Sequence, residues 1–266
     1  LKVDHFLDMP VSLPPLDEQR RIVARIEELA TLIEEAQELR VKAWEEAGAM
    51  FKSALAEMLG GEDAWTQETV KDVIVSMDAG WSPQCETYPA RGDEWGVLKT
   101  TAVQWCQFHP EENKKLPRTL EPRPELSVEA GDVLVTRAGP RKRVGVVAAV
   151  RESNPNLMMS DKLIRLRPDP AKITPLFLQY VLASPVSQEY LFQRKTGLAS
   201  AQENISQKIL RSTPIAYPSL DEQRRMVRHL DELQAQVDEL IIFQEDTQAE
   251  LDALLPSVLD RAFRGE

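Results

Sequence analysis

The sequence predicts an α+β protein: one globular domain with a mainly antiparallel sheet, flanked by two long helices that form an antiparallel coiled coil. Two observations predict this fold class. A segment of roughly fifty residues occurs twice, at an offset of 204 positions from Leu16 to Leu220, with apolar residues at helical spacing in both copies. Between the copies, short apolar runs alternate with turn residues, a pattern typical of strands.

Length and composition exclude several other classes of protein. A chain of 266 residues with 42% hydrophobic and 28% charged residues has the size of about two domains and the composition of a globular protein. The sequence contains no apolar run of about 18 residues, so no membrane helix is expected. Cys85 and Cys106 lack the paired ligands of a zinc site, and they predict a reduced, cytoplasmic protein that binds no metal.

The repeat divides the chain into four segments. Residues 17–62 and 217–266 are the two long helices, residues 63–216 are the globular domain, and residues 1–16 align with 205–220 as the tail of a further domain. The sequence does not begin with Met, so we expect a fragment of a longer protein.

Each helix opens at the same motif, Leu-Asp-Glu-Gln-Arg-Arg, at 16–21 and again at 220–225. Asp17 and Asp221 are suitable N-caps, and about 40 residues of helix would extend roughly 60 Å. Apolar steps of three and four predict a coiled-coil seam. The predicted seam residues are Ile22, Ile26, Leu29, Ile33, Leu230, Leu233, Val237 and Leu240. Pro256 predicts a kink or an early end of the second helix.

The domain between the helices reads as strands followed by helices. Strands are expected at 96–101, 132–136, 144–150, 163–167 and 214–217, and helices at 175–192 and 202–212. Ala138-Gly139-Pro140 predicts a hairpin that joins the second and third of these strands.

The net charge of −11 seems to exclude nucleic acid, but its distribution does not. Residues 63–216 carry 20 basic and 18 acidic side chains, and within residues 131–211 the count is 13 to 6. Basic residues concentrate in the hairpin 137–143 and at Arg194-Lys195, which suits contacts to phosphates. A solvated hairpin tip is the alternative interpretation of the same residues.

The duplicated motif, with its Pro-rich entry and a single α+β domain between the copies, resembles the specificity subunit of type I restriction–modification systems. The segments Trp95-Gly96-Val97-Leu98-Lys99-Thr100 and Gly131-Asp132-Val133-Leu134 resemble one class of target-recognition domain, and residues 254–266 resemble the family's C-terminus. A complete subunit of this family is expected to have two recognition domains, whereas this sequence has one. The resemblance therefore implies a C-terminal half of a subunit, a deliberate truncation or a natural half-subunit.

The resemblance implies a protein without catalytic activity that reads one half of a bipartite DNA target. Its helices would set the distance to the other half, roughly 17 base pairs at most. The implied partners are double-stranded DNA, methyltransferase subunits that use S-adenosylmethionine for DNA methylation, a restriction endonuclease that translocates DNA, and a second copy if the chain is a half-subunit. No cofactor is expected in this chain, and no membrane partner.

Base readout in the major groove needs hydrogen-bonding side chains on loops. The expected base-reading residues are Arg141, Lys142, Arg143, Ser200, Gln202 and Asn204. The expected phosphate contacts are Lys99, Arg137, Lys162, Arg194 and Lys195. The alternative interpretation of each of these residues is a solvated surface side chain. For Asn204 a further alternative is a cap of the following helix. The alternative function is a coiled-coil assembly scaffold that does not bind DNA.

Overall fold

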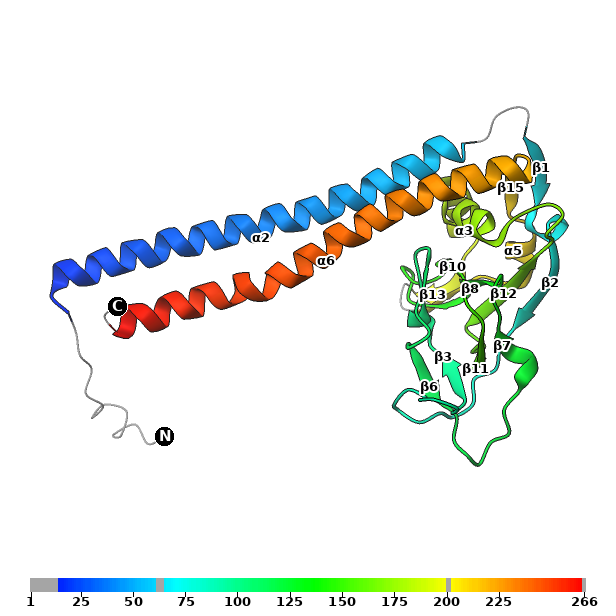
Figure 1. Ribbon diagram of the computed structural model, residues 1–266, viewed down its shortest axis with the longest axis horizontal. Coiled ribbons are helices and arrows are strands. Elements are labelled where there is room, and N and C mark those ends of the chain that lie inside the picture. Colours follow the sequence, from blue (N-terminus) through cyan, green and yellow to red (C-terminus); the bar gives the residue numbers. More distant parts are fainter. Residues whose placement is uncertain (1–13, 61–64, 200–201, 265–266) are drawn as a thin grey trace. The chain divides into compact units, whose positions relative to one another are not determined.

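Two long helices and a mixed set of short strands make up the protein (Figure 1). The computed structural model describes residues 14–60, 65–199 and 202–264. Helix α2 extends over Leu16–Met58 and helix α6 over Leu220–Arg264. The chain divides into two compact units, one made of residues 1–50 with 234–266 and the other of residues 51–233. The predicted tail at 1–16 lies almost entirely outside the described residues.

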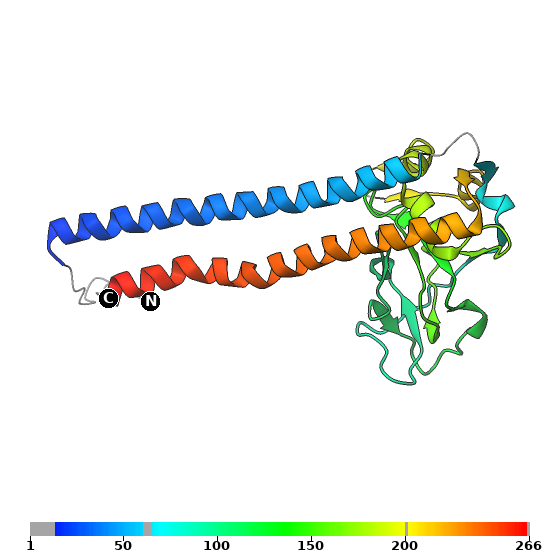
Figure 2. The same ribbon diagram turned by 45° about the horizontal axis from the view of Figure 1, so that its top comes forward.

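The first unit contains residues 16–50 of α2 and 234–264 of α6, which run side by side and antiparallel (Figures 1 and 2). Within it the Gln37 side-chain amide donates to the Asp252 carboxylate at 3.3 Å. Of the predicted seam residues in this unit, Ile22, Ile26, Leu29, Ile33 and Val237 are half-buried. Leu240 differs, because 37% of it is exposed. Its neighbour Ile241 is half-buried instead, so the buried stripe on α6 steps by four residues at this point.

The sequence allowed an early end of the second helix at Pro256. That expectation is wrong, because α6 continues to Arg264. Proline removes one backbone donor from a helix and so leaves the carbonyl four residues earlier without its partner. Pro256 and Asp252 are both exposed, so water can satisfy that carbonyl and the helix continues.

The second unit contains fifteen short strands among its described residues. They are β1 (Thr66–Thr69), β2 (Ile74–Ala79), β3 (Gly96–Leu98), β4 (Val103–Gln104), β5 (Gln107–Phe108), β6 (Asn113–Lys115), β7 (Ser127–Val128), β8 (Val133–Thr136), β9 (Ala138–Gly139), β10 (Val147–Ala149), β11 (Asn154–Met158), β12 (Leu163–Pro168), β13 (Thr196–Ala199), β14 (Gln202–Asn204) and β15 (Pro214–Tyr217). Three 3₁₀ turns, η1 (Val70–Asp72), η2 (Thr100–Ala102) and η3 (Pro124–Leu126), connect some of them.

Two four-stranded sheets dominate this unit, with strand orders β10-β8-β12-β2 and β6-β3-β11-β7. All pairings in them are antiparallel except β3 with β11, so the mainly antiparallel sheet is confirmed. The predicted hairpin is also confirmed, because β8 pairs with β10 from Val135 opposite Val147. The strand expected at 214–217 is β15, which pairs with β1.

Helix α3 (Pro175–Ala183) covers the first sheet, and its Phe177 and Leu178 lie in the main core with Val133 and Ile164. The buried guanidinium of Arg165 links this sheet to the edge of the second, donating to the carbonyls of Ser127 and Glu125 at 2.7 and 3.0 Å. A buried side chain of β12 therefore joins the two sheets of the domain.

Two helical expectations were wrong in detail. The helix predicted at 175–192 is two helices, α3 and α4 (Pro185–Phe192), because Ser184 caps α4 and Pro185 cannot continue α3. The helix predicted at 202–212 is strand β14 followed by the short helix α5 (Gln207–Arg211). No described helix has the length and hydropathy to span a membrane.

Candidate nucleic-acid interface

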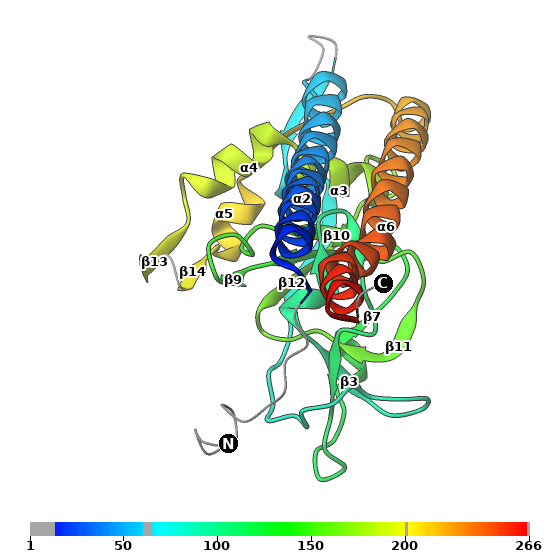
Figure 3. The same ribbon diagram turned by 90° about the vertical axis from the view of Figure 1, so that its left-hand side faces the viewer.

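The two basic loops of the sequence meet in one small sheet. Strand β9 comes from the loop after β8, strands β13 and β14 come from the segment after α4, and their order is β13-β14-β9 (Figure 3). Glu203 lies opposite Gly139, and Asn204 lies opposite Ala138. The next residue, Ile205, donates its backbone N–H to the Arg137 carbonyl at 2.8 Å. Segments more than 50 residues apart in the sequence thus form one surface, which we call the loop sheet (residues 137–143, 194–199 and 202–204).

Backbone geometry shapes the tip of the first loop. Gly139 has φ +147°, a conformation that other residues rarely adopt, and it lets the chain pair with β14 while turning into Pro140. The turn closes where the Arg143 N–H donates to the Pro140 carbonyl at 2.7 Å. Arg141 and Lys142 are therefore presented at the tip, and both are exposed.

Arg143 has a different environment from its two neighbours. Its guanidinium donates to Gln104 Oε1 at 2.6 Å, to the Val103 carbonyl at 2.7 Å and to the Thr100 carbonyl. Burial lowers the pKa of Arg143, and its Nε has no hydrogen-bond partner among the described residues. The side chain holds the loop to η2 and β4, so base reading by Arg143, as expected from the sequence, would require it to give up these bonds.

Arg141 is held on an aromatic ring. Its guanidinium carbon lies 4.3 Å from the centroid of Phe192, and its Nε lies 3.5 Å from Glu203 Oε1. Lys195 completes the group, because its Nζ donates to the Arg141 carbonyl at 3.2 Å and lies 5.4 Å from the same ring centroid. Burial lowers the pKa of Lys195, and the nearby Glu203 carboxylate counteracts that effect.

Two other predicted phosphate contacts, Arg137 and Arg194, belong to the loop sheet, and a third, Lys162, lies next to it. The Arg194 guanidinium stacks 3.8 Å above the Tyr190 ring and donates to the Tyr190 carbonyl at 3.1 Å. The Arg137 N–H donates to the Lys162 carbonyl at 2.8 Å, which brings these two basic residues together. Lys142 and Lys162 are exposed, and their ammonium groups have no partner in the part of the chain that the structure describes.

Lys99 does not belong to the loop sheet but precedes η2, next to the Thr100 carbonyl that Arg143 holds. It forms an ion pair with Glu112 at 2.8 Å. Hydrogen bonds from Lys99 and then Thr101 lower the pKa of the Glu112 carboxyl. This lysine is already neutralised, which weakens the expectation that it contacts phosphate.

The three polar candidates of the second loop have different outcomes. Ser200 lies outside the described residues, and Gln202 is the first residue of β14. Asn204 ends β14, and its Oδ1 is buried without a partner among the described residues. The proposed helix cap at Asn204 is wrong, since Ser206 caps α5 by accepting a hydrogen bond from the Ile209 N–H at 3.2 Å.

Sequence reasoning missed the residues that organise this surface, namely Phe192, Tyr190 and Glu203. A signal existed for the two aromatic residues, because they end helix α4 directly before Arg194-Lys195. Nothing in the sequence indicated that Glu203 would lie beside Arg141, since this contact depends on the pairing of β9 with β14.

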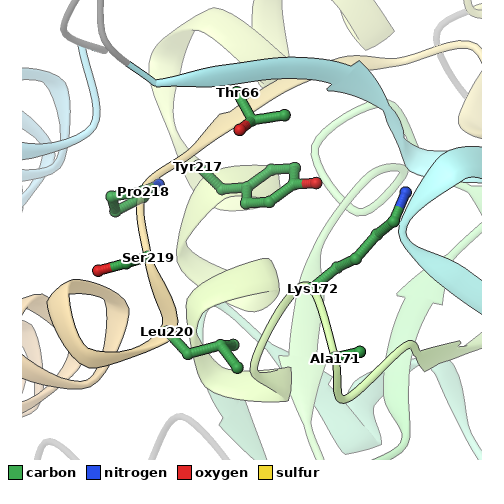
Figure 4. A pocket seen from close by; sticks show the side chains of 7 residues that line it. All are labelled: Thr66, Ala171, Lys172, Tyr217, Pro218, Ser219 and Leu220. Atoms are coloured by element: carbon green, nitrogen blue, oxygen red, sulfur yellow. The ribbon is translucent and has the colours of Figure 1, made fainter.

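A polar pocket of about 250 Å³ lies at the entry to α6 and is lined by Thr66, Lys172, Tyr217 and Ser219 among others (Figure 4). The Glu68 carboxylate accepts from Lys172 Nζ, at 3.0 Å to each oxygen, and from the Tyr217 hydroxyl at 2.9 Å. Burial, and then this bond, raise the pKa of Tyr217 to about 12. The lysine charge is therefore already compensated, and the pocket offers no free cation to a ligand.

This architecture, a mainly antiparallel domain and two long helices that open with the same motif, is shared with a class of DNA specificity proteins. The chain belongs to this family: residues 111–250, more than half of its length, match the type I restriction modification DNA specificity domain.

Individual relatives agree with this assignment. The chain is similar to the type I restriction enzyme EcoEI specificity subunit of Escherichia coli, at 40% identity over 74% of this chain and 34% of that protein. It also resembles the HsdS subunit from Thermoanaerobacter tengcongensis, with a TM-score of 0.56 and 30% identity over 96% of this chain and 60% of that one. A further solved chain comes from work on the complex assembly and conformational transition of the type I restriction–modification system. It gives a TM-score of 0.72 and 29% identity, and the match covers 96% of this chain and 61% of that one. This sequence thus spans about a third of the curated relative and about six tenths of the two solved chains.

Proposed function

We propose that this chain reads one half of a bipartite DNA target as part of the specificity subunit of a type I restriction–modification complex. In this proposal residues 63–216 are the recognition domain and residues 17–62 and 217–266 the two conserved helices. The single observation that carries the proposal is the loop sheet, where pairing of β9 with β14 gathers Arg137, Arg141, Lys142 and Lys195 on one surface.

Charge supports this assignment of roles. The helical segments are strongly acidic, with 13 acidic side chains against 7 basic ones in residues 1–62, so they suit protein partners and repel a duplex. The domain's own basic surplus is local to the loop sheet and its surroundings. Clustered cations release counterions from DNA, which supplies most of the sequence-independent affinity.

The remaining parts of the assembly belong to partners. Methyltransferase subunits would supply the chemistry with S-adenosylmethionine, and a restriction subunit would cleave and translocate, while this chain catalyses no reaction. The packing of α2 against α6 as a coiled coil, self-association of a half-subunit and a cytoplasmic location are parts of the same proposal. The seam residues Ile26 and Leu233, both half-buried, support the helix packing, whereas Leu230 is buried in the main core of the domain.

Salt-dependent binding tests the proposal against the scaffold alternative. Fluorescence anisotropy of a labelled random-sequence duplex, measured with the full chain over a series of salt concentrations, should give a steep negative slope of log affinity against log salt, about 0.9 per phosphate neutralised. Arg141→Ala with Lys142→Ala should weaken binding and flatten that slope by up to about two.

A matched control removes the same charge elsewhere. Arg20→Ala with Arg21→Ala deletes two exposed arginines from α2 and should leave the affinity and the slope unchanged. Equal effects of the two double variants would place the loop sheet outside the interface. No salt-dependent binding by the unmodified chain would favour the scaffold.

A further inference from the structure

Among the basic side chains of the loop sheet, Arg141 is both oriented by its neighbours and open at its end. The Phe192 ring supports one face of its guanidinium, and Glu203 holds its inner nitrogen, Nε. The two terminal nitrogens have no hydrogen-bond partner among the described residues, and the side chain is 49% exposed. This combination leaves the outer edge of a fixed, planar donor directed at solvent.

Three other cations of the loop sheet differ from Arg141 in one of these two properties. Arg194 also stacks on a ring, but one of its terminal nitrogens already donates to the Tyr190 carbonyl. Arg143 is fixed, but its guanidinium is occupied by acceptors of the protein. Lys142 is open, but nothing in the described structure orients its ammonium group. A free lysine suits phosphates, which need charge at no particular angle, whereas bidentate recognition needs a planar fork in a defined orientation.

The acidic residue within this basic surface supports the same distinction. The Glu203 side chain is only 13% exposed, and its Oε2 has no partner within the described residues. A carboxylate here lowers the attraction for a polyanion, so a surface built only for phosphates would be better without it. Its position beside Nε instead restricts the rotation of Arg141, and a side chain already ordered loses less entropy on binding.

We propose that Arg141 reads a guanine of the target through the N7 and O6 acceptors in the major groove, and that Phe192 and Glu203 are its positioning residues. This inference rests on the proposed DNA-binding function. Arginine presents two parallel donors that match these two acceptors, and this pair distinguishes guanine from the other three bases. The half-site read by this domain therefore contains a guanine that contacts the tip of the 137–143 loop.

The first experiment identifies the guanine. Duplexes selected by the full chain from a random library are sequenced, and the preferred duplex is remade with each guanine replaced in turn by adenine or by 7-deazaguanine, which lacks the N7 acceptor. Anisotropy should show one guanine at which both replacements weaken binding to the unmodified chain. The unmodified chain should prefer guanine over adenine at that position by roughly 5- to 150-fold in affinity. Arg141→Ala should bind the guanine and adenine duplexes equally.

The positioning residues are tested by paired variants. Phe192→Leu should lose the discrimination at that guanine, while Phe192→Tyr, which keeps the ring face, should retain it. Glu203→Gln keeps the shape but not the charge, so affinity for random duplex should hold or rise while discrimination falls. A residue that only stabilised the fold would lower all affinities together, and circular dichroism confirms that each variant is folded.

The outcomes separate the inference from the function on which it rests. If Arg141→Ala weakens every duplex equally and reduces the salt slope by about one, Arg141 contacts a phosphate and the guanine assignment is wrong, although the domain still binds DNA. The guanine assignment is also wrong if Arg141→Ala keeps the preference of the unmodified chain at every guanine. Absence of DNA binding by the unmodified chain would instead refute the proposed function.

Discussion

Gln19 and Gln223 occupy the same position in the two copies of the repeat, and each donates its side-chain amide to the carbonyl of a proline five residues earlier. The distances are 2.7 Å to Pro14 and 3.0 Å to Pro218. Only Gln223 does more: it is fully buried, donates to the Lys172 carbonyl at 2.8 Å and accepts from the Thr174 N–H at 2.9 Å. The same amide thus shapes a helix entry in both copies, and in the second it also attaches the domain to α6.

This difference predicts unequal effects of the same substitution. Gln223→Ala leaves a buried N–H and a buried carbonyl without partners, so it should reduce the free energy of unfolding by about 2–4 kcal/mol. Gln19→Ala, at a partly exposed site, should cost about 0.5–1 kcal/mol. Urea unfolding followed by circular dichroism measures both. Similar losses for the two variants would contradict the role assigned to Gln223.

Neighbouring residues of the 137–143 loop should also respond differently. Arg143→Ala removes three internal hydrogen bonds from a charged donor and should destabilise the domain by about 1.5–3 kcal/mol. Arg143→Lys should rescue little, because an ammonium group cannot reproduce the fork of a guanidinium. Lys142→Ala should leave thermal unfolding unchanged, and a comparable loss there would show that the loop itself, not the Arg143 contacts, is responsible.

Stability should fall at alkaline pH in a way that depends on Tyr217. The unfolded tyrosine ionises near pH 10, whereas the folded one keeps its proton until about pH 12. Between these values the unfolded state has lost the proton and the native state has not, so rising pH favours unfolding, by up to about 2 kcal/mol. Tyr217→Phe should remove this part of the pH dependence. The free energy of unfolding of both proteins is measured from pH 9 to pH 12. If the two plots of free energy against pH stay parallel, the assignment to Tyr217 is wrong.

The helix pair offers adjacent residues for a test of the seam. Ile33 is half-buried and Leu32 is 52% exposed. Ile33→Asp should therefore reduce the free energy of unfolding by about 1–3 kcal/mol and lower the melting temperature, and Leu32→Asp should do neither. Leu233→Asp should behave like Ile33→Asp in the second copy. Differential scanning calorimetry measures all three, and equal melting of the Ile33 and Leu32 variants would exclude the predicted seam.

Local patterns in the sequence predicted much of the fold. The repeat indicated both long helices to within a few residues of Leu16 and Leu220, because helix periodicity is a local property of the chain. The N-caps predicted at Asp17 and Asp221 are wrong, since both residues lie inside the first turn of their helices. The β8–β10 hairpin was predictable for the same reason. Strand β9 was not, since two residues carry no periodicity and pair only with a strand more than 60 positions later.

The sequence by itself therefore determined the duplicated helices, the α+β domain between them and the concentration of basic residues at 137–143 and 194–195. Only the tertiary structure decided what each of these residues does. Three consecutive basic residues, Arg141, Lys142 and Arg143, look alike in sequence. Yet the first is held on an aromatic ring, the second has no side-chain partner in the described part of the chain, and the third is bonded to the fold. The physical reason is that charge is a property of the residue, whereas its orientation and availability depend on partners that distant segments supply.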